Sequence, residues 1–260
     1  MTILEQLAAH ARERVEAAKN KISLKEIRAA AFAMPEDDFS FETALRKPKI
    51  SFICECKKAS PSKGIIARDF PYLDIAREYE AAGADCISVL TEPRWFLGRD
   101  RYLKEVAGTV KIPCLRKDFT VDEYMIYEAK LLGASAVLLI AAILTDEQLC
   151  EYGKICGDLG ISALYEAHDE EEIRRALYAG ARIIGVNNRN LSDFSVDTEN
   201  SRRLRNLVPQ EVIFVSESGV QSAEDVKRLR EIGADAVLIG ETLMKAENKR
   251  DKLSELKGLL

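Results

Sequence analysis

The chain has 260 residues, of which 47% are hydrophobic and 31% are charged, and its formal net charge is −5. This length and apolar content suffice for one large core, and the interspersed acidic and basic residues leave no basic block of the kind that binds nucleic acid. No apolar run approaches the roughly 20 residues that span a bilayer, and the start of the chain does not match a signal peptide. We therefore expect a cytoplasmic protein that binds neither nucleic acid nor membranes, and whose ligand can still be a small anion.

Residues 1–48 precede the first strand-like run and are expected to form a helical N-terminal extension. Apolar residues recur at helical spacing within residues 3–31, which predicts one or two amphipathic helices, and a polar stretch from Pro35 to Ser40 follows. His10 lies in the charged part of this extension, so we expect it on the solvated surface.

A short phrase recurs about every 50 residues along the rest of the chain. Its four copies begin at Ala82, Leu132, Ala179 and Ile232, and each places a glycine at the end of a helical pattern, directly before an apolar run. Glycine supplies the left-handed conformation that ends a helix. Apolar runs without alternation indicate strands that are covered on both faces, as in parallel sheets.

Eight strand-like runs alternate with eight helix-like segments. The strands are expected within residues 51–57, 86–91, 111–118, 136–142, 161–167, 183–188, 211–218 and 236–241. The helices are expected near residues 73–82, 99–108, 121–132, 145–159, 169–179, 198–206, 222–232 and 249–259. This alternation predicts an α/β fold, a single (β/α)8 or TIM barrel over residues 1–260, in preference to an open doubly wound sheet. The N-terminal extension is then expected either to cap the amino-terminal mouth or to lie over the active-site face.

Charged and polar residues gather where these strands end, which is where barrel enzymes place their active sites. Glu55 and Lys57 share one side of the first strand, and Lys117, Glu166 and Asn187 end later strands. One charged residue at a strand end commonly reaches water, but six strands that end in this way indicate a shared pocket. Buried carboxylates and lysines in such a pocket perturb one another's pKa toward catalytic use.

The last two strands end in turns that contain glycine, Ser218-Gly219 and Gly240-Glu241. Glycine permits close approach of the backbone, and free N–H groups at the start of a helix bind anions. The loops that follow the seventh and eighth strands commonly bind phosphate in such barrels. These two glycine-containing turns therefore predict a phosphate-binding corner.

The six cysteines form no CxxC pair and lie mostly in apolar runs, so we expect reduced residues of the core or the helices. The chain has two histidines, too few for a histidine-based metal cluster. His168, which follows the fifth strand, is interpreted as structural.

The chain resembles the indole-3-glycerol phosphate synthase family over essentially its whole length. The most specific segment is Glu-Cys-Lys-Lys-Ala-Ser-Pro-Ser-Lys-Gly at 55–64, and further segments lie at 90–98, 115–119, 187–191, 216–219 and 240–244. The departures, Cys54, Cys56 and Trp95, do not fall on residues with a chemical role.

This resemblance implies a carboxy-lyase of tryptophan biosynthesis that converts 1-(2-carboxyphenylamino)-1-deoxyribulose 5-phosphate to indole-3-glycerol phosphate, carbon dioxide and water. Ring closure requires a proton donor to the ketone oxygen, which we assign to Lys117. Burial, Lys57 and Arg189 are expected to lower the pKa of Lys117, against the opposing effect of Glu55 and Glu166.

Loss of the last proton requires a base, which we assign to Glu166. We expect neighbouring cations to outweigh burial and lower the pKa of Glu166. Glu55 either shares this work or stabilises a cationic intermediate. Lys57 is left open as a carboxylate anchor, a phosphate contact or a second acid.

The remaining site residues are assigned to binding. Arg189, Asn187, Ser60 and Lys57 can meet the substrate carboxylate. An apolar slot for the aromatic ring can form from Phe96, Phe119 and Leu191. The phosphate corner comprises Ser218, Gly219, Gly240 and Glu241. Neither a metal nor a cofactor is expected, because acid–base chemistry suffices, and the chain is expected to be a monomer, with a weak dimer as the alternative.

Three rival interpretations remain. One is a related phosphate-binding barrel such as phosphoribosylanthranilate isomerase, and another is a Schiff-base aldolase that uses Lys117, which borohydride would trap. The third is a catalytically silent scaffold, which has no need of Lys117 together with Glu166.

Overall fold

Eight parallel strands close into a barrel in the computed structural model, which describes residues 2–190 and 194–258. Around the barrel the strands follow the order β1-β10-β9-β8-β7-β6-β5-β4. Their bounds are β1 (Ser51–Cys56), β4 (Cys86–Leu90), β5 (Cys114–Lys117), β6 (Ala136–Ile140), β7 (Ser162–Ala167), β8 (Ile183–Asn187), β9 (Ile213–Glu217) and β10 (Ala236–Ile239). The (β/α)8 barrel expected from the sequence is confirmed.

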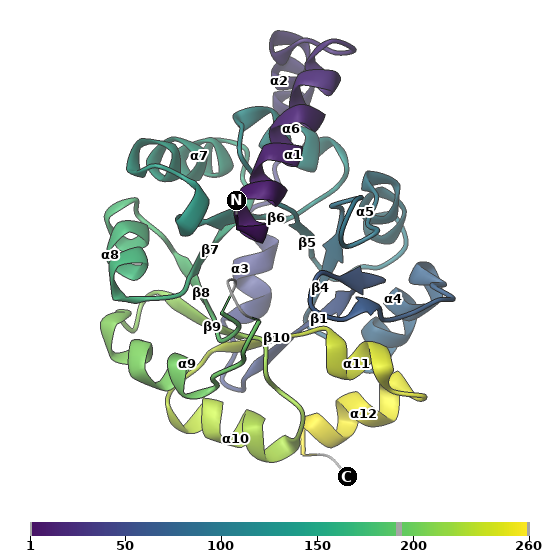
Figure 1. Ribbon diagram of the computed structural model, residues 1–260, viewed down its shortest axis with the longest axis vertical. Helices are drawn as coiled ribbons and strands as arrows, with labels where there is room; N and C mark the ends of the chain where they lie inside the picture. The colour runs from purple at the N-terminus through teal and green to yellow at the C-terminus, as the bar shows by residue number, and fades with distance from the viewer. Residues whose placement is uncertain (1, 191–193, 259–260) are drawn as a thin grey trace.

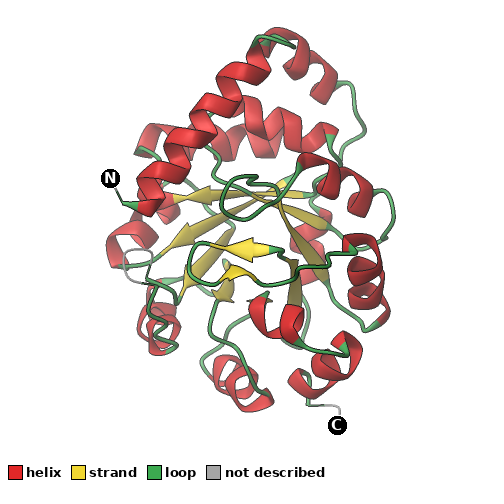
Figure 2. Ribbon diagram, turned by 45° about the vertical axis from the view of Figure 1, so that its right-hand side comes forward, coloured by secondary structure: helices red, strands yellow, loops and turns green. Residues whose placement is uncertain are grey.

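Helices surround this barrel and connect its strands (Figures 1 and 2). The connecting helices are α4 (Tyr72–Ala81), α5 (Asp100–Ala107), α6 (Glu123–Leu131), α7 (Asp146–Asp158), α8 (Glu170–Tyr178), α9 (Glu199–Leu204) and α10 (Ala223–Glu231), and α12 (Lys249–Leu256) follows the last strand. None of the helices in the described ranges is long and apolar enough to cross a membrane.

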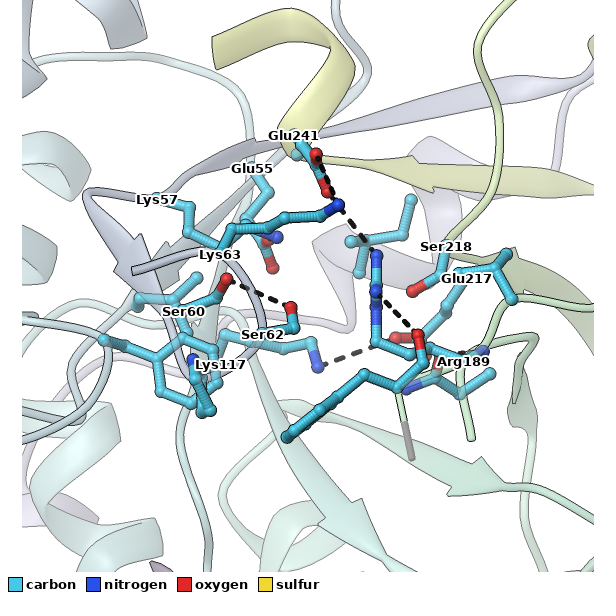
Figure 3. A pocket seen from close by; sticks show the side chains of 18 of the residues that line it. Glu55, Lys57, Ser60, Ser62, Lys63, Lys117, Arg189, Glu217, Ser218 and Glu241 are labelled. Atoms are coloured by element: carbon cyan, nitrogen blue, oxygen red, sulfur yellow. Dashed lines mark hydrogen bonds and ion pairs between the residues drawn. The ribbon is translucent and has the colours of Figure 1, made fainter. Parts of the chain in front are cut away.

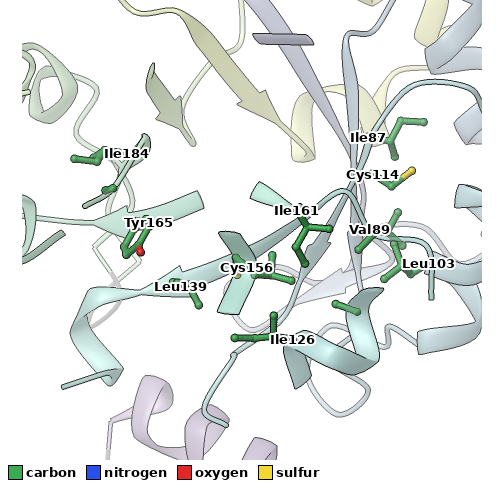
Figure 4. Packing of buried hydrophobic residues seen from close by; sticks show 14 of the residues in the cluster. Ile87, Val89, Leu103, Cys114, Ile126, Leu139, Cys156, Ile161, Tyr165 and Ile184 are labelled. Carbon is green, nitrogen blue, oxygen red and sulfur yellow. The ribbon is translucent and has the colours of Figure 1, made fainter. Parts of the chain in front are cut away.

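Alternation along the strands divides the buried residues into two layers. Cys54, Val89 and Cys114 point outward and pack against the helices, and Figure 4 shows part of this outer layer. Ile53 and Leu115 point inward into the centre of the barrel. The period of two then carries Glu55 and Lys117, two residues further along each strand, to the inner face at the carboxyl end.

The N-terminal extension covers both ends of the barrel, which the sequence had left as alternatives. Its first two helices are α1 (Ile3–Lys19) and α2 (Leu24–Phe32), and each begins with a capping box, led by Thr2 and Ser23 respectively. The start of helix α1 lies over the edge of the carboxyl-terminal mouth (Figure 1), where Leu4 and Leu7 line the central cavity.

Helix α3 (Ser40–Leu45) seals the opposite end of the barrel. Phe41 and Leu45 are fully buried and pack in the inner cluster with Ile53 and Leu115. The helices expected from the sequence ended at residue 31, and the stretch from Pro35 to Ser40 was interpreted as polar. This plug was therefore not predicted, because its apolar side chains lie in a helix of only 6 residues.

One other short element was not expected. A hairpin of β2 (Ala59–Ser60) and β3 (Gly64–Ile65) occupies the predicted loop after β1. The short helix α11 (Glu241–Lys245) follows Gly240 after β10, where the phosphate site was expected to include the start of a helix. Strands of two residues are too short to produce a periodic pattern.

The expectation that His10 is a solvated surface residue is wrong. Its side chain is 19% exposed, its Nδ1 lies 3.2 Å from Glu92 Oε1, and its ring contacts Trp95 edge-on. The reason is that α1 docks on the barrel mouth, so its charged face meets charged partners rather than water.

Candidate active site

A cavity of about 580 Å³ opens at the carboxyl ends of the strands (Figure 3). Thirteen of the fourteen residues assigned from the sequence line it, and they come from β1, β2, β5, β7, β8, α11 and the loops that follow the strands. They are Glu55, Lys57, Ser60, Phe96, Lys117, Phe119, Glu166, Asn187, Arg189, Ser218, Gly219, Gly240 and Glu241. Leu191 lies outside the described residues.

Lys117 forms the centre of the charged floor of this cavity. Its Nζ lies 3.1 Å from Glu166 Oε2 and 3.6 Å from Glu217 Oε2. Asn187 Nδ2 donates a hydrogen bond of 3.3 Å to the other oxygen of Glu166, Oε1. The ammonium of Lys117 thus faces the buried carboxylates of Glu166 and Glu217. The amide of Asn187 holds the Glu166 carboxylate in orientation.

The direction expected for the pKa of Lys117 is wrong. Burial lowers this pKa, but Glu166, Glu217 and Glu55 outweigh burial and raise it above the ordinary value for lysine. The cations that were expected to help burial are engaged elsewhere, since Lys57 pairs with Glu55 at 2.7 Å and Arg189 pairs with Glu241 at 3.5 Å.

The pKa values of the two carboxylates beside Lys117, those of Glu166 and Glu217, shift in opposite directions. Burial raises the pKa of Glu166, but Lys117 and then His168 lower it below its usual range, which confirms the expected direction. Burial also raises the pKa of Glu217, with contributions from Glu166 and Glu55 that Lys117 does not offset, and the pKa reaches about 8. Two carboxylates that share one cation cannot both ionise at low cost, so one keeps a proton.

Glu217 is the main site residue that received no role from the sequence. It ends the seventh strand and lies within the segment 216–219 that carries the family resemblance, but no role was assigned to it. Its position two residues after the inward-facing Val215 was the available signal, because that register aims it at the same floor as Lys117. Gly185 on the neighbouring strand β8 makes room for it, since a Cβ there would lie 3.2 Å from the carboxyl carbon of Glu217.

Ser218 and Gly219 form a tight turn above the end of β9. Both have a left-handed backbone, with φ of 67° and 93° respectively. A Cβ on Gly219 would lie 2.7 Å from Thr198 Cγ2, so two independent reasons require glycine there. Gly240 leads into α11, and a Cβ on it would lie 2.8 Å from Lys57 Nζ. The glycines therefore let backbone approach the cavity closely.

Three cations converge on the carboxylate of Glu241, at the top of β10. Lys245 lies at 2.6 Å, Arg189 at 3.5 Å and Lys63 at 3.8 Å, and Figure 3 shows Lys63 and Arg189 reaching it from two different loops. This corner carries more positive than negative charge. Lys63, on the unexpected β2–β3 hairpin, had received no role from the sequence.

Aromatic and apolar side chains form the opposite wall. The rings of Phe96 and Phe119 lie 6.0 Å apart. The loop that carries Phe96 is fixed by the buried carboxylate of Glu92, which accepts hydrogen bonds from the backbone N–H groups of Trp95 at 2.8 Å and Phe96 at 3.0 Å. The wall can therefore hold a flat apolar group in a set position.

A buried ion network supports Lys117 from outside the barrel. Arg116 points outward and donates hydrogen bonds of 2.7 Å to Asp100 and Glu128. Asp118, on the other side of Lys117, accepts two hydrogen bonds from Arg14 of α1, at 2.6 Å and 3.1 Å. Because these hydrogen bonds fix Arg116 and Asp118, they also fix the backbone of Lys117, which lies between them.

A closed parallel barrel with an acid–base cluster at the carboxyl ends of its strands defines a (β/α)8-barrel enzyme. A family model described as indole-3-glycerol phosphate synthase matches residues 4–256. The chain is 55% identical over 257 residues to an indole-3-glycerol phosphate synthase of Ruminiclostridium cellulolyticum, covering 98% of this chain and 99% of the relative. It is 52% identical over 270 residues to that of Lachnoclostridium phytofermentans, covering 99% and 100%.

The chain therefore belongs to the indole-3-glycerol phosphate synthase family, which comprises carboxy-lyases of tryptophan biosynthesis. The family and the activity expected from the sequence are confirmed.

Solved structures with distant sequences share the fold. A 3-hexulose-6-phosphate synthase from Salmonella typhimurium superposes with a TM-score of 0.63 at 13% identity, covering 81% of this chain and 98% of that one. A thiamine phosphate pyrophosphorylase from Pyrococcus furiosus gives 0.60 at 16% identity, covering 81% and 94%. At these identities the likeness concerns the barrel alone.

Proposed function

We propose that Lys117 and Glu166 carry out the proton transfers that close the pyrrole ring of indole-3-glycerol phosphate. The observation that carries this proposal is their direct contact, 3.1 Å, at the floor of the central cavity. The substrate is the phosphorylated carboxyphenylamino-deoxyribulose, whose aromatic carbon attacks its own ketone. The ketone oxygen gains negative charge as this bond forms and requires a proton.

Lys117 supplies that proton. Its raised pKa keeps it fully protonated at neutral pH, so the ammonium is present in every molecule when substrate binds. An ammonium in a buried site also stabilises the developing oxyanion through its charge before the proton moves. The same raised pKa argues against a Schiff-base aldolase, because that reaction requires lysine as a neutral amine.

Glu166 removes the last proton after carbon dioxide has left. Its lowered pKa keeps it ionised, as a base must be, and the hydrogen bond from Asn187 fixes one of its oxygens. Departure of the hydroxyl as water requires an acid, and Glu217 fits this role because its raised pKa leaves it protonated at neutral pH. Glu55 is held by Lys57 and contributes charge near the reacting atoms.

The rest of the cavity binds the two ends of the substrate. Gly219, Gly240 and the backbone N–H of Glu241 form the phosphate corner, since the carboxylate of Glu241 itself would repel a phosphate. Arg189 and Lys57 attract the substrate carboxylate, and Phe96 and Phe119 hold the aromatic ring. The protein acts as a cytoplasmic monomer, one barrel domain with residues 1–48 as its helical extension.

Appearance of indole fluorescence on addition of substrate tests the role of Lys117. Lys117→Ala should reduce turnover by about 10²–10⁴-fold with the fold intact, because it removes a general acid. Lys104→Ala, on the exposed side of α5, is the matched control and should retain wild-type turnover. A Lys117→Ala enzyme with more than about a tenth of wild-type activity would refute the assignment.

Steady-state kinetics across pH distinguish the role of Glu166 from that of Glu55. Glu166→Gln should lose most of its kcat with little change in KM, because it keeps size and hydrogen bonding but not basicity. Glu55→Gln should retain more activity. A larger loss at Glu55 would exchange the two roles.

A further inference from the structure

His168 lies beside Glu166 but lines a neighbouring cavity and not the one that holds Lys117. It follows the end of β7 directly, two residues after Glu166. Its Nε2 lies 3.5 Å from Glu166 Oε1. This is the oxygen that also accepts the hydrogen bond from Asn187.

The other side of the imidazole is held by Glu172 of α8. Glu172 Oε2 lies 3.1 Å from His168 Nδ1 and accepts the backbone N–H of His168 at 2.7 Å. Asp169 caps α8 and accepts the N–H of Glu172 at 2.9 Å, which fixes the start of the helix. Asn200 of α9 donates to the carbonyl of His168 at 3.1 Å. The ring is thereby clamped between two carboxylates.

This arrangement decides the protonation state of the ring. Nδ1 must carry a proton to bond to the Glu172 carboxylate. A neutral ring would then present the lone pair of Nε2 to the carboxylate of Glu166, in a place where Nε2 is buried without a hydrogen-bond partner among the described residues. A protonated ring presents N–H groups to both carboxylates and removes this conflict.

We propose that His168 is a positioning residue that, as an imidazolium, holds Glu166 ionised and aimed at Lys117. The inference rests on the proposed role of Glu166 as the base. His168 does not touch the substrate cavity, and acts through the charge and the orientation of one carboxylate oxygen.

The surrounding charges favour the same state. Burial lowers the pKa of His168, but the hydrogen bond to Glu172 and the charge of Glu166, with smaller contributions from Glu172 and Glu217, raise it above the ordinary value. The ring also borders a second cavity, whose other charged lining residues are Asp169, Glu172, Asp197, Arg189 and Arg203. Two of these are cations and oppose protonation, whereas the carboxylates in direct contact favour it.

The chain contains two histidines, which makes a direct measurement simple. In ring-labelled wild-type protein without substrate, one histidine signal should titrate with a midpoint above about 6.5, the ordinary histidine value. His168→Gln should remove that signal, and His10→Gln should remove the other. Glu166→Gln and Glu172→Gln should each move the His168 midpoint to lower pH, because each removes a negative charge from the ring. A midpoint that Glu166→Gln leaves unchanged would overturn the inference.

Kinetics distinguish positioning from a purely structural role. His168→Gln should lower kcat by about 10-fold, the lower end of the range for residues that orient metal ligands, which hold their partners in a comparable way, with KM changed less than about twofold. Without the imidazolium the pKa of Glu166 rises, so the acid limb of kcat should move to higher pH. Glu172→Gln, which leaves the ring and the substrate cavity intact, should move the same limb in the same direction by a smaller amount. A loss that is uniform across pH in both variants would show that His168 does not act through the ionisation of Glu166, and would overturn the inference.

The two measurements also separate this inference from the assignment on which it rests. If Glu166→Gln abolishes turnover but leaves the His168 midpoint unchanged, the positioning role of His168 is refuted and the assignment of Glu166 as the base is retained. If Glu166→Gln shifts the midpoint and retains turnover, Glu166 is not the base, and the inference falls with that assignment.

Discussion

Glu217 should destabilise the protein in a pH-dependent manner, and Glu217→Gln should relieve this. Glu217 is 2% exposed, and its Oε1 is buried without a hydrogen-bond partner among the described residues. Its pKa rises from 4.5 to about 8 on folding, and each pKa unit corresponds to 1.36 kcal/mol, so ionisation in the folded state opposes stability by roughly 5 kcal/mol at most. The amide of glutamine has the same shape and no charge to bury.

The sign follows from proton binding. Between its unfolded and folded pKa values, Glu217 holds a proton in the folded state and has lost it in the unfolded state. The stability that it contributes is therefore complete below the unfolded pKa and is lost as pH rises to the folded pKa, by about 1.4 kcal/mol per pH unit. The advantage of Glu217→Gln over wild type should grow over the same window and then become constant.

Urea unfolding of wild type and Glu217→Gln at several pH values between about 5 and 9 measures this difference. From about pH 5.5 to 7.5 the free energy of unfolding of the variant should gain about 3 kcal/mol on that of wild type. Glu224→Gln, on exposed α10, is the control and should stay within about 0.5 kcal/mol of wild type throughout. A difference between Glu217→Gln and wild type that does not change with pH would refute the assigned protonation state.

Two further outcomes follow from the contacts at the barrel mouth. Gly219→Ala should raise KM more than it lowers kcat, because the added Cβ meets Thr198 and Val196 and forces the turn out of the phosphate corner. Steady-state kinetics with inorganic phosphate as a competing ligand measure this change, and an unchanged KM would contradict the prediction. Arg14→Met should lower the free energy of unfolding by about 3 kcal/mol, because it leaves the buried carboxylate of Asp118 without its closest cation. Urea unfolding at neutral pH measures this change. A change below about 1 kcal/mol would show that Arg116 alone suffices to stabilise the Asp118 carboxylate.

The barrel and most of its site could be predicted from the sequence because both follow from periodicity. Continuous apolar runs marked the strands, and the polar residues at their carboxyl ends placed Glu55, Lys117 and Glu166 at one mouth of the barrel. The plug helix α3 and the β2–β3 hairpin escaped prediction because elements of two to six residues repeat no pattern.

Electrostatics within the site could not be predicted in the same way. The sequence placed Lys57, Arg189 and Lys117 in one pocket, but it did not reveal which carboxylate each would meet. Lys57 meets Glu55 and Arg189 meets Glu241, so neither lowers the pKa of Lys117 as expected. A choice among partners that lie a few ångströms apart depends on rotamers and loop paths, which periodicity does not encode.

Inward-facing side chains such as Ile53 and Leu115 fill the centre of the barrel, and α3 covers its amino-terminal end, so the cavity opens at the carboxyl-terminal end. Phe41 and Leu45 close the base, so substrate must arrive and product must leave through the mouth that α1 overhangs. Lys63, Glu241 and Arg189 line this cavity and are joined by ion pairs of 3.8 Å and 3.5 Å. Because substrate and product share this opening, a substitution that breaks these ion pairs is expected to change the rates of substrate entry and product release together.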